Sequence, residues 1–211
     1  MDLIRFILKS RGMCHMTRFQ NSPRIRDNNV AEHSYYVALY AHMICGYIDI
    51  SPETEHGAMR LALLHDIHEG ISVEVPNNVK RMLKPEIAAI EAAAIKEIFQ
   101  GEAWRVENSD PLAAAIVKLA DCMDALIYSV EEYKMGNKFF RAVIAEIKYG
   151  ILDIAEHLDI MYCIRKQSDA PLSLSLVNKL ISALGIDDIN AMTSDMDNMT
   201  HFHKGFDNAI I

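Results

Sequence analysis

The chain has 211 residues, of which 51% are hydrophobic and 24% are charged, and its formal net charge at pH 7 is −8. This length suits one domain with a substantial core, and without an apolar run of about eighteen residues we expect no membrane span. The acidic balance argues against binding to long nucleic acid, but it leaves small anionic ligands open because a metal ion can reverse the field inside one pocket.

Apolar residues recur at helical spacing along the chain, while alternating runs of strand type are nearly absent. The first eleven residues, MDLIRFILKSR, carry charges among their apolar residues and predict an amphipathic helix and not a signal peptide. Further helices are expected over residues 30–48, 54–68, 85–99, 112–133, 138–165 and 171–184. The pattern predicts an all-α fold, a helical bundle.

Residues 1–185 are expected to form the single domain. After Gly185 the chain becomes acidic and polar, so residues 186–211 are expected to form a weakly ordered tail. Two polar connections, residues 12–29 and 70–78, interrupt the helical pattern, and loops of this kind often carry function on a rigid scaffold. The four cysteines are scattered without a CxxC pair, which favours a reducing cytoplasm.

The stretch RLALLHDIHEG, residues 60–70, ends an apolar helix abruptly with His65 and Asp66. Burying this pair is costly unless a partner satisfies it, and a divalent metal would do so because imidazole and carboxylate are both good ligands. Neighbouring helical residues point about 100° apart. Any further ligands must therefore come from other helices.

Two residues on other predicted helices are candidates for those ligands. His33 lies early in the helix expected from residue 30, and Asp121 interrupts a strongly apolar helix. Each also has an ordinary explanation, since His33 could be a hydrogen-bonded histidine and Asp121 could pair with Lys118, three residues earlier on the same face. The residues alone leave both interpretations open.

The order His33, His65–Asp66, Asp121 resembles the H…HD…D pattern of HD-domain phosphohydrolases. The segments that carry the resemblance lie within residues 1–165 and are similar to those of one branch, the YfbR-like bacterial 5′-deoxynucleotidases. These segments are TRFQNSPRIRDNNVAEHSYYVALYAH, ALLHDIHEGISVEVPNNVK and VKLADCMDAL.

The resemblance implies an all-α enzyme that acts on a deoxynucleotide, forms homo-oligomers and uses a divalent metal ion: Co, Mn, Zn, Fe or Mg. It implies that the metal ligands are His33, His65, Asp66 and Asp121. It also places Glu69 at the catalytic acidic position and Arg18 at the phosphate-contacting arginine. The chain departs from the compared relative at two positions near the expected nucleotide, with Phe19 in place of Trp and Glu74 in place of Asp.

Several of these residues have competing explanations in the sequence itself. Glu69 would reach the metal's side if a helical turn continued past Asp66, or it could be a solvated glutamate at the helix end. Lys118 and Lys80 are candidate phosphate ligands or solvated surface charges. Phe19 could stack on the base or pack in the core.

We expect a 5′-deoxynucleotidase that releases phosphate from a deoxynucleoside monophosphate. One alternative is a dATP triphosphohydrolase of the phage type, which releases deoxyadenosine and triphosphate and would need the lysines for the additional phosphates. A non-enzyme alternative is a nucleotide-sensing binding protein, which the intact His/Asp set and Glu69 disfavour. A surplus of aromatic and methionine side chains supports the homo-oligomer; the residues are Tyr36, Tyr40, Met43, Tyr47 and Tyr162.

Overall fold

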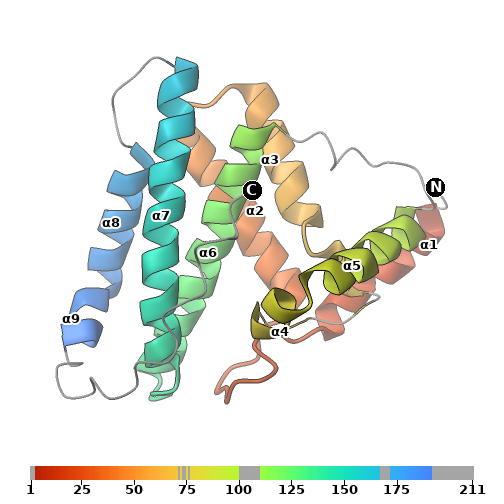
Figure 1. Ribbon diagram of the computed structural model, residues 1–211, viewed down its shortest axis with the longest axis horizontal. Coiled ribbons are helices and arrows are strands. Elements are labelled where there is room, and N and C mark those ends of the chain that lie inside the picture. Colours follow the sequence, from red (N-terminus) through yellow and green to blue (C-terminus); the bar gives the residue numbers. More distant parts are fainter. Residues whose placement is uncertain are drawn as a thin grey trace. The chain divides into compact units, whose positions relative to one another are not determined.

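The computed structural model describes residues 3–70, 72, 75, 77–99, 110–166 and 172–191, which fold as helices joined by loops (Figure 1). The 3₁₀ helices are η1 (Arg11–His15) and η2 (Ile67–Gly70). The α-helices are α1 (Leu3–Ser10), α2 (Val30–Tyr47), α3 (Pro52–Leu64), α4 (Asn77–Met82), α5 (Lys84–Phe99), α6 (Pro111–Lys134), α7 (Phe140–Lys166), α8 (Leu172–Leu184) and α9 (Ile186–Ala191). The all-α prediction is confirmed, and none of these helices is long and apolar enough to cross a membrane.

The chain divides within α6 into two compact units, an N-terminal unit that ends at Asp124 and a C-terminal unit that begins at Ala125. In the N-terminal unit α2 and α3 pack side by side (Figure 1). Fully buried alanines on both helices, such as Ala41 and Ala58, take up little space in this core. A second apolar cluster of this unit joins Met13 and Val30 to Ile67 and Ile98.

Side-chain caps fix where the helices of the N-terminal unit begin. Asn29 Oδ1 accepts a hydrogen bond from the backbone N–H of Glu32 at 2.9 Å, which starts α2. Asp110 accepts from the N–H of Leu112 at 3.1 Å at the start of α6. The other oxygen of Asp110 accepts from the Thr54 hydroxyl at 2.9 Å, so one carboxylate ties the start of α3 to the start of α6.

The C-terminal unit shows a cap that links two helices. Asp159 of α7 is buried, and its two oxygens accept the backbone N–H groups of Ser173 and Leu174 at 2.7 and 2.8 Å. Because these are orphan donors at the N-terminus of α8, the carboxylate holds α8 against α7. Figure 1 shows α7 and α8 side by side.

The prediction for the chain beyond Gly185 is wrong in its first residues. Gly185 has φ +69°, a conformation that ends α8, but α9 follows at once. Ile186 and Ile189 lie three residues apart and are both buried, and Asp187 pairs with Lys148 of α7 at 2.5 Å. This apolar spacing and ion pair order residues that composition alone marks as a tail; residues 192–211 lie outside the described part of the chain.

Two glycines allow η1 and η2 to approach each other at backbone distance. A methyl group at Gly12 would overlap with the carbonyl oxygen of Gly70. A methyl group at Gly70 would in turn come within 3.2 Å of the carbonyl oxygen of Lys9. The close approach fixes η2, which also breaks the helix expected over residues 54–68: α3 ends at Leu64 and η2 begins at Ile67.

We expect Gly12→Ala to lower the free energy of unfolding by about 1–3 kcal/mol, because the added methyl group overpacks a backbone contact that cannot yield. Gly46 is the matched control, since it lies in α2 and a Cβ there would meet nothing within 4 Å. Gly46→Ala should raise stability by about 0.5–1 kcal/mol through helix propensity. Urea unfolding checks both values, and wild-type stability of Gly12→Ala would contradict the close contact.

Candidate metal centre

Four side chains from α2, from the end of α3 and from α6 converge in the N-terminal unit. The buried His33 places its Nε2 atom 3.2 Å from His65 Nε2 and 3.3 Å from Asp121 Oδ1. Asp66 Oδ2 lies 3.6 Å from His33 Nε2 and 3.1 Å from His65 Nε2. The structure therefore brings together the four residues that the sequence pattern singles out.

The Nδ1 atoms of the two imidazoles, which face away from the centre, each lie within hydrogen-bond distance of an oxygen acceptor. His33 Nδ1 lies 2.6 Å from Asp124 Oδ2, and His65 Nδ1 lies 2.7 Å from the carbonyl oxygen of Ala62. The carbonyl and the carboxylate oxygen act as acceptors here, so the hydrogen of each ring is assigned to Nδ1. Both Nε2 atoms then present lone pairs to the centre, the arrangement that metal-ligating histidines adopt.

Two cations border the carboxylates of this centre. Arg18 places Nη1 3.4 Å from Asp66 Oδ2 and Nη2 3.9 Å from Asp121 Oδ1. Lys118 Nζ lies 3.0 Å from Asp121 Oδ2, the pairing considered for it from its i,i+3 spacing. Arg18 thus spans both carboxylates, while Lys118 contacts Asp121 from the more exposed side.

The pKa values of these carboxyl groups follow from their neighbours. Burial alone would raise the pKa of Asp66, but the neighbouring imidazole of His65 and the charge of Arg18 outweigh it and hold that pKa well below its usual range. Burial is likewise outweighed at Asp121, whose pKa is lowered by Lys118 and by His33. For His65, burial lowers the pKa, and Asp66 and Asp121 more than reverse this effect. Both carboxylates are therefore ionised at neutral pH.

The donor set fits a divalent metal ion. Two bare imidazole nitrogens and two ionised carboxylates crowd one small volume, and each would repel the others without positive charge between them. His33, His65 and Asp121 offer ligand atoms within 4.8 Å of one another, and Asp66, His68 and Glu69 form a second such group. Mixed nitrogen and oxygen donors suit Mn, Fe, Co or Zn.

The loop before α2 positions Arg18. An antiparallel bridge joins Thr17 to Asn29, with the Arg18 N–H donating to the Asn28 carbonyl at 2.8 Å. Phe19 adopts φ +53°, a left-handed conformation that is costly for an aromatic residue and that marks strained functional loops. Arg24 Nη1 donates to the Phe19 carbonyl at 2.9 Å and so holds this turn.

Glu69 is placed by η2 and not by a continued α-helix. Its backbone N–H donates to the Asp66 carbonyl at 3.0 Å, and the residue is 3% exposed. Lys80 of α4, predicted as a phosphate ligand, lies with Nζ 3.7 Å from Glu69 Oε1 and 3.4 Å from Glu91 Oε1 of α5. Glu74 lies outside the described residues.

Two residues of this centre escaped the sequence interpretation. Asp124 follows Asp121 by three residues, so the two share one face of α6, and this spacing could have identified it. Glu91 lies in the acidic and alanine-rich α5, where the sequence carries no signal that would separate it from a solvated glutamate.

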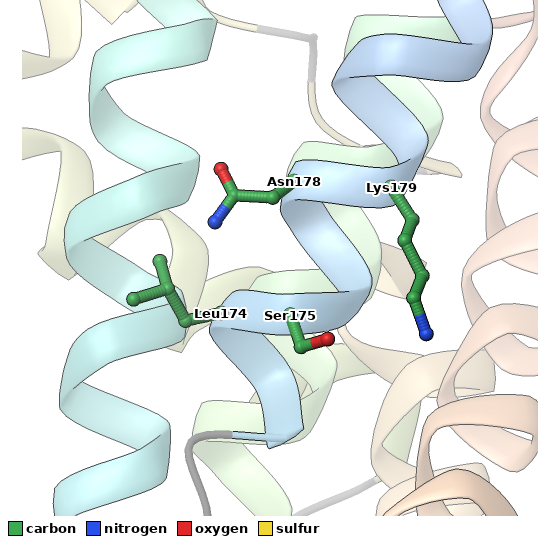
Figure 2. Close-up of a pocket in the computed structure, with 4 residues that line it drawn as sticks. All are labelled: Leu174, Ser175, Asn178 and Lys179. Atoms are coloured by element: carbon green, nitrogen blue, oxygen red, sulfur yellow. The ribbon is translucent and has the colours of Figure 1, made fainter.

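A surface pocket on α8 belongs to the C-terminal unit and is lined by Leu174, Ser175, Asn178 and Lys179 (Figure 2). It contains none of the residues predicted for the site. Its lining offers no imidazole, thiol or carboxylate, so it lacks the ligand types that suit a divalent metal.

Comparison with known proteins gives a family for this chain. The protein-family model described as 5′-deoxynucleotidase YfbR-like matches residues 5–167. A 5′-deoxynucleotidase from Shewanella oneidensis is 32% identical over 132 residues, which cover 55% of this chain and 68% of that protein. The 5′-deoxynucleotidase YfbR of Salmonella typhi is 32% identical over 138 residues, with 56% and 67% covered.

Solved structures share the helical fold at lower sequence identity. An HD phosphohydrolase of cyanophage S-2L (DatZ), bound to dA and one catalytic Zn²⁺ ion, gives a TM-score of 0.58 at 19% identity and covers 87% of this chain and 96% of its own. An HD-domain phosphohydrolase from Listeria innocua gives 0.65 at 16% identity, with 90% and 95% covered. Because the family model spans most of the chain, the protein belongs to the YfbR-like 5′-deoxynucleotidase family, and its fold agrees with that of the HD-domain phosphohydrolases compared above.

Proposed function

We propose that this protein is a metal-dependent 5′-deoxynucleotidase that hydrolyses deoxynucleoside monophosphates and releases phosphate. The observation that carries the proposal is the convergence of His33 Nε2 with His65 Nε2 and two carboxylates within 3.6 Å, bordered by Arg18. Family membership and the relatives named 5′-deoxynucleotidase support hydrolysis of deoxynucleotides.

The ligands proposed for the ion are His33, His65, Asp66 and Asp121. The metal is one of Mn, Fe, Co, Zn or Mg; the mixed donors favour a transition metal, and the structural neighbour with Zn²⁺ supports zinc as a candidate. Such an ion supplies positive charge that acidifies the attacking water and neutralises phosphoryl oxygens. Asp124 and the Ala62 carbonyl hold the two imidazoles in the tautomer that this role requires.

Arg18, Lys118 and Phe19 are the proposed substrate-binding residues. The planar guanidinium of Arg18 can bind two phosphate oxygens at once, and Lys118 brings a second charge beside Asp121. Phe19 follows Arg18 in the strained turn, and the Arg18 guanidinium lies 5.9 Å from the centre of its ring. An aromatic ring so close to the phosphate ligand can stack on the base or sugar of a bound nucleotide.

Glu69 is the proposed general base. Its carboxylate is almost fully buried and forms part of the group with Asp66 and His68, so it lies beside the proposed ion. In that position it can accept a proton from the attacking water.

The monophosphate is better supported than a triphosphate. The relatives that match this chain are named 5′-deoxynucleotidase. Arg18 and Lys118 border the carboxylates of the proposed metal centre and could bind one phosphate there, whereas Lys80 lies between Glu69 and Glu91.

We also propose that the protein acts as a homo-oligomer in the cytoplasm. Tyr36, Met43 and Tyr47 are exposed along one side of α2, where a second copy could cover them. Tyr162, expected with them, is 6% exposed, so it does not contribute. Light scattering at micromolar concentration checks the assembly, and a monomer mass would contradict the homo-oligomer.

All four cysteines are free thiols, which suits the reducing cytoplasm that we propose as the compartment.

The substrate is tested with a panel of deoxynucleoside mono-, di- and triphosphates in Mn²⁺, Co²⁺, Zn²⁺ or Mg²⁺. We expect phosphate release from monophosphates in at least one of these metals and no activity after chelation. Chromatography of the products distinguishes phosphate, pyrophosphate and triphosphate. Release of intact triphosphate from dATP with dAMP untouched would support the phage-type reaction instead.

Replacing Glu69 by Ala separates catalysis from binding. We expect kcat to fall by about 10²-fold or more, as for a lost general base, while bound metal and KM change little. Steady-state kinetics with elemental analysis of the same preparation gives all three quantities. A wild-type kcat would remove Glu69 from the mechanism.

Asp124→Ala tests the orientation of His33. Loss of the acceptor frees the ring to rotate or change tautomer, and we expect metal affinity to fall about 10- to 100-fold. Competition with a chelator measures the affinity, and Glu131→Ala, an exposed acid on the same helix, is the control. Equal affinities in the two variants would show that Asp124 does not act on the metal ligands.

A further inference from the structure

Lys80 lies between two carboxylates that come from different elements. Its Nζ atom is 3.7 Å from Glu69 Oε1 on η2 and 3.4 Å from Glu91 Oε1 on α5. Glu69 is 4% exposed in its side chain, whereas the side chains of Lys80 and Glu91 are 33% and 32% exposed. The cation therefore links a buried carboxylate to a more exposed one.

The three charges depend on one another. A buried carboxylate such as Glu69 is stabilised by a positive partner nearby. A lysine on a flexible four-carbon stem, however, loses side-chain entropy when it is held in place. Glu91 provides the second attraction that keeps Lys80 at this position. The same Glu91 oxygen lies 3.5 Å from Nε2 of the buried His68, so α5 also contacts η2 directly beside Glu69.

We propose that Glu91 is a positioning residue of this enzyme, which acts through Lys80 to hold the carboxylate of Glu69 toward the metal centre. The inference rests on the proposed catalytic role of Glu69. It gives Lys80 a function different from phosphate binding, and it includes α5 in the active site although none of its residues was predicted to belong there.

The two roles of Lys80 have different kinetic consequences. A phosphate ligand contributes to substrate binding, so its loss raises KM. A residue that positions the general base is needed for the chemical step, so its loss lowers kcat and leaves KM nearly unchanged. The same distinction applies to Glu91, whose ion pairs in the described part of the chain join it to Lys80 and His68.

The test measures kcat and KM for Glu91→Gln and Lys80→Met, each alone and combined with Glu69→Ala, using the deoxynucleoside monophosphate that the wild type hydrolyses fastest. With Glu69 present, each variant should lower kcat roughly 5- to 50-fold, in the range of coupling between contacting residues. In the Glu69→Ala background each should change kcat less than about twofold, because the group they position is gone. Glu91→Asp should recover part of the lost rate.

Glu86→Gln and Lys96→Met are the matched controls, since both residues are exposed on α5, and both variants should keep wild-type kinetics. Wild-type metal content and thermal unfolding of Glu91→Gln confirm an intact fold. A raised KM with unchanged kcat in Lys80→Met would overturn the proposal in favour of phosphate binding. Equal losses of kcat with and without Glu69 would also overturn it. A wild-type kcat of Glu69→Ala alone would instead contradict the proposed function.

Discussion

Electrostatic repulsion among converging acceptors is the constraint on which this structure depends. His33 and His65 present lone pairs to each other at 3.2 Å, with two ionised carboxylates beside them. Bringing these groups together removes the water that would otherwise solvate each of them. Nearby positive charge must therefore compensate for the lost hydration and for their mutual repulsion. Arg18 and Lys118 supply part of that charge, and the proposed divalent ion would supply the rest. The chemistry of the donors supports such an ion.

The scaffold fixes these groups through short backbone and side-chain contacts. Asp110 ties the starts of α3 and α6, and Asp124 locks the ring of His33 across α2 and α6. The close contact between Gly12 and Gly70 packs η1 against η2 and so fixes the position of Glu69, which lies in η2. A shift of an ångström in any of these helices would move a ligand out of reach, which is why orienting contacts matter as much as the ligands.

Helix periodicity was enough to predict the fold class, whereas the converging quartet of His33, His65–Asp66 and Asp121 was singled out by the resemblance of its order to a family pattern. Sequence reasoning did not find the break after Leu64, because the residues 60–70 keep a helical pattern and the turn depends on the contact of Gly70 with η1. Asp124 could have been predicted from the sequence, because its i,i+3 spacing places it on the same face of α6 as Asp121. Glu91 could not have been predicted, because its contacts with Lys80 and His68 depend on how α4 and α5 pack against η2. No local sequence pattern encodes this packing.

The central claim is that the four acceptors bind one divalent ion directly. X-ray absorption at the metal edge of the loaded protein tests it most directly, because scattering from imidazole rings is distinct from that of carboxylate or water oxygen. The account predicts two imidazole nitrogens with oxygen ligands at one metal per chain, and loss of one imidazole contribution or of the metal in His65→Ala. A spectrum with oxygen ligands alone, unchanged in His65→Ala, would contradict it.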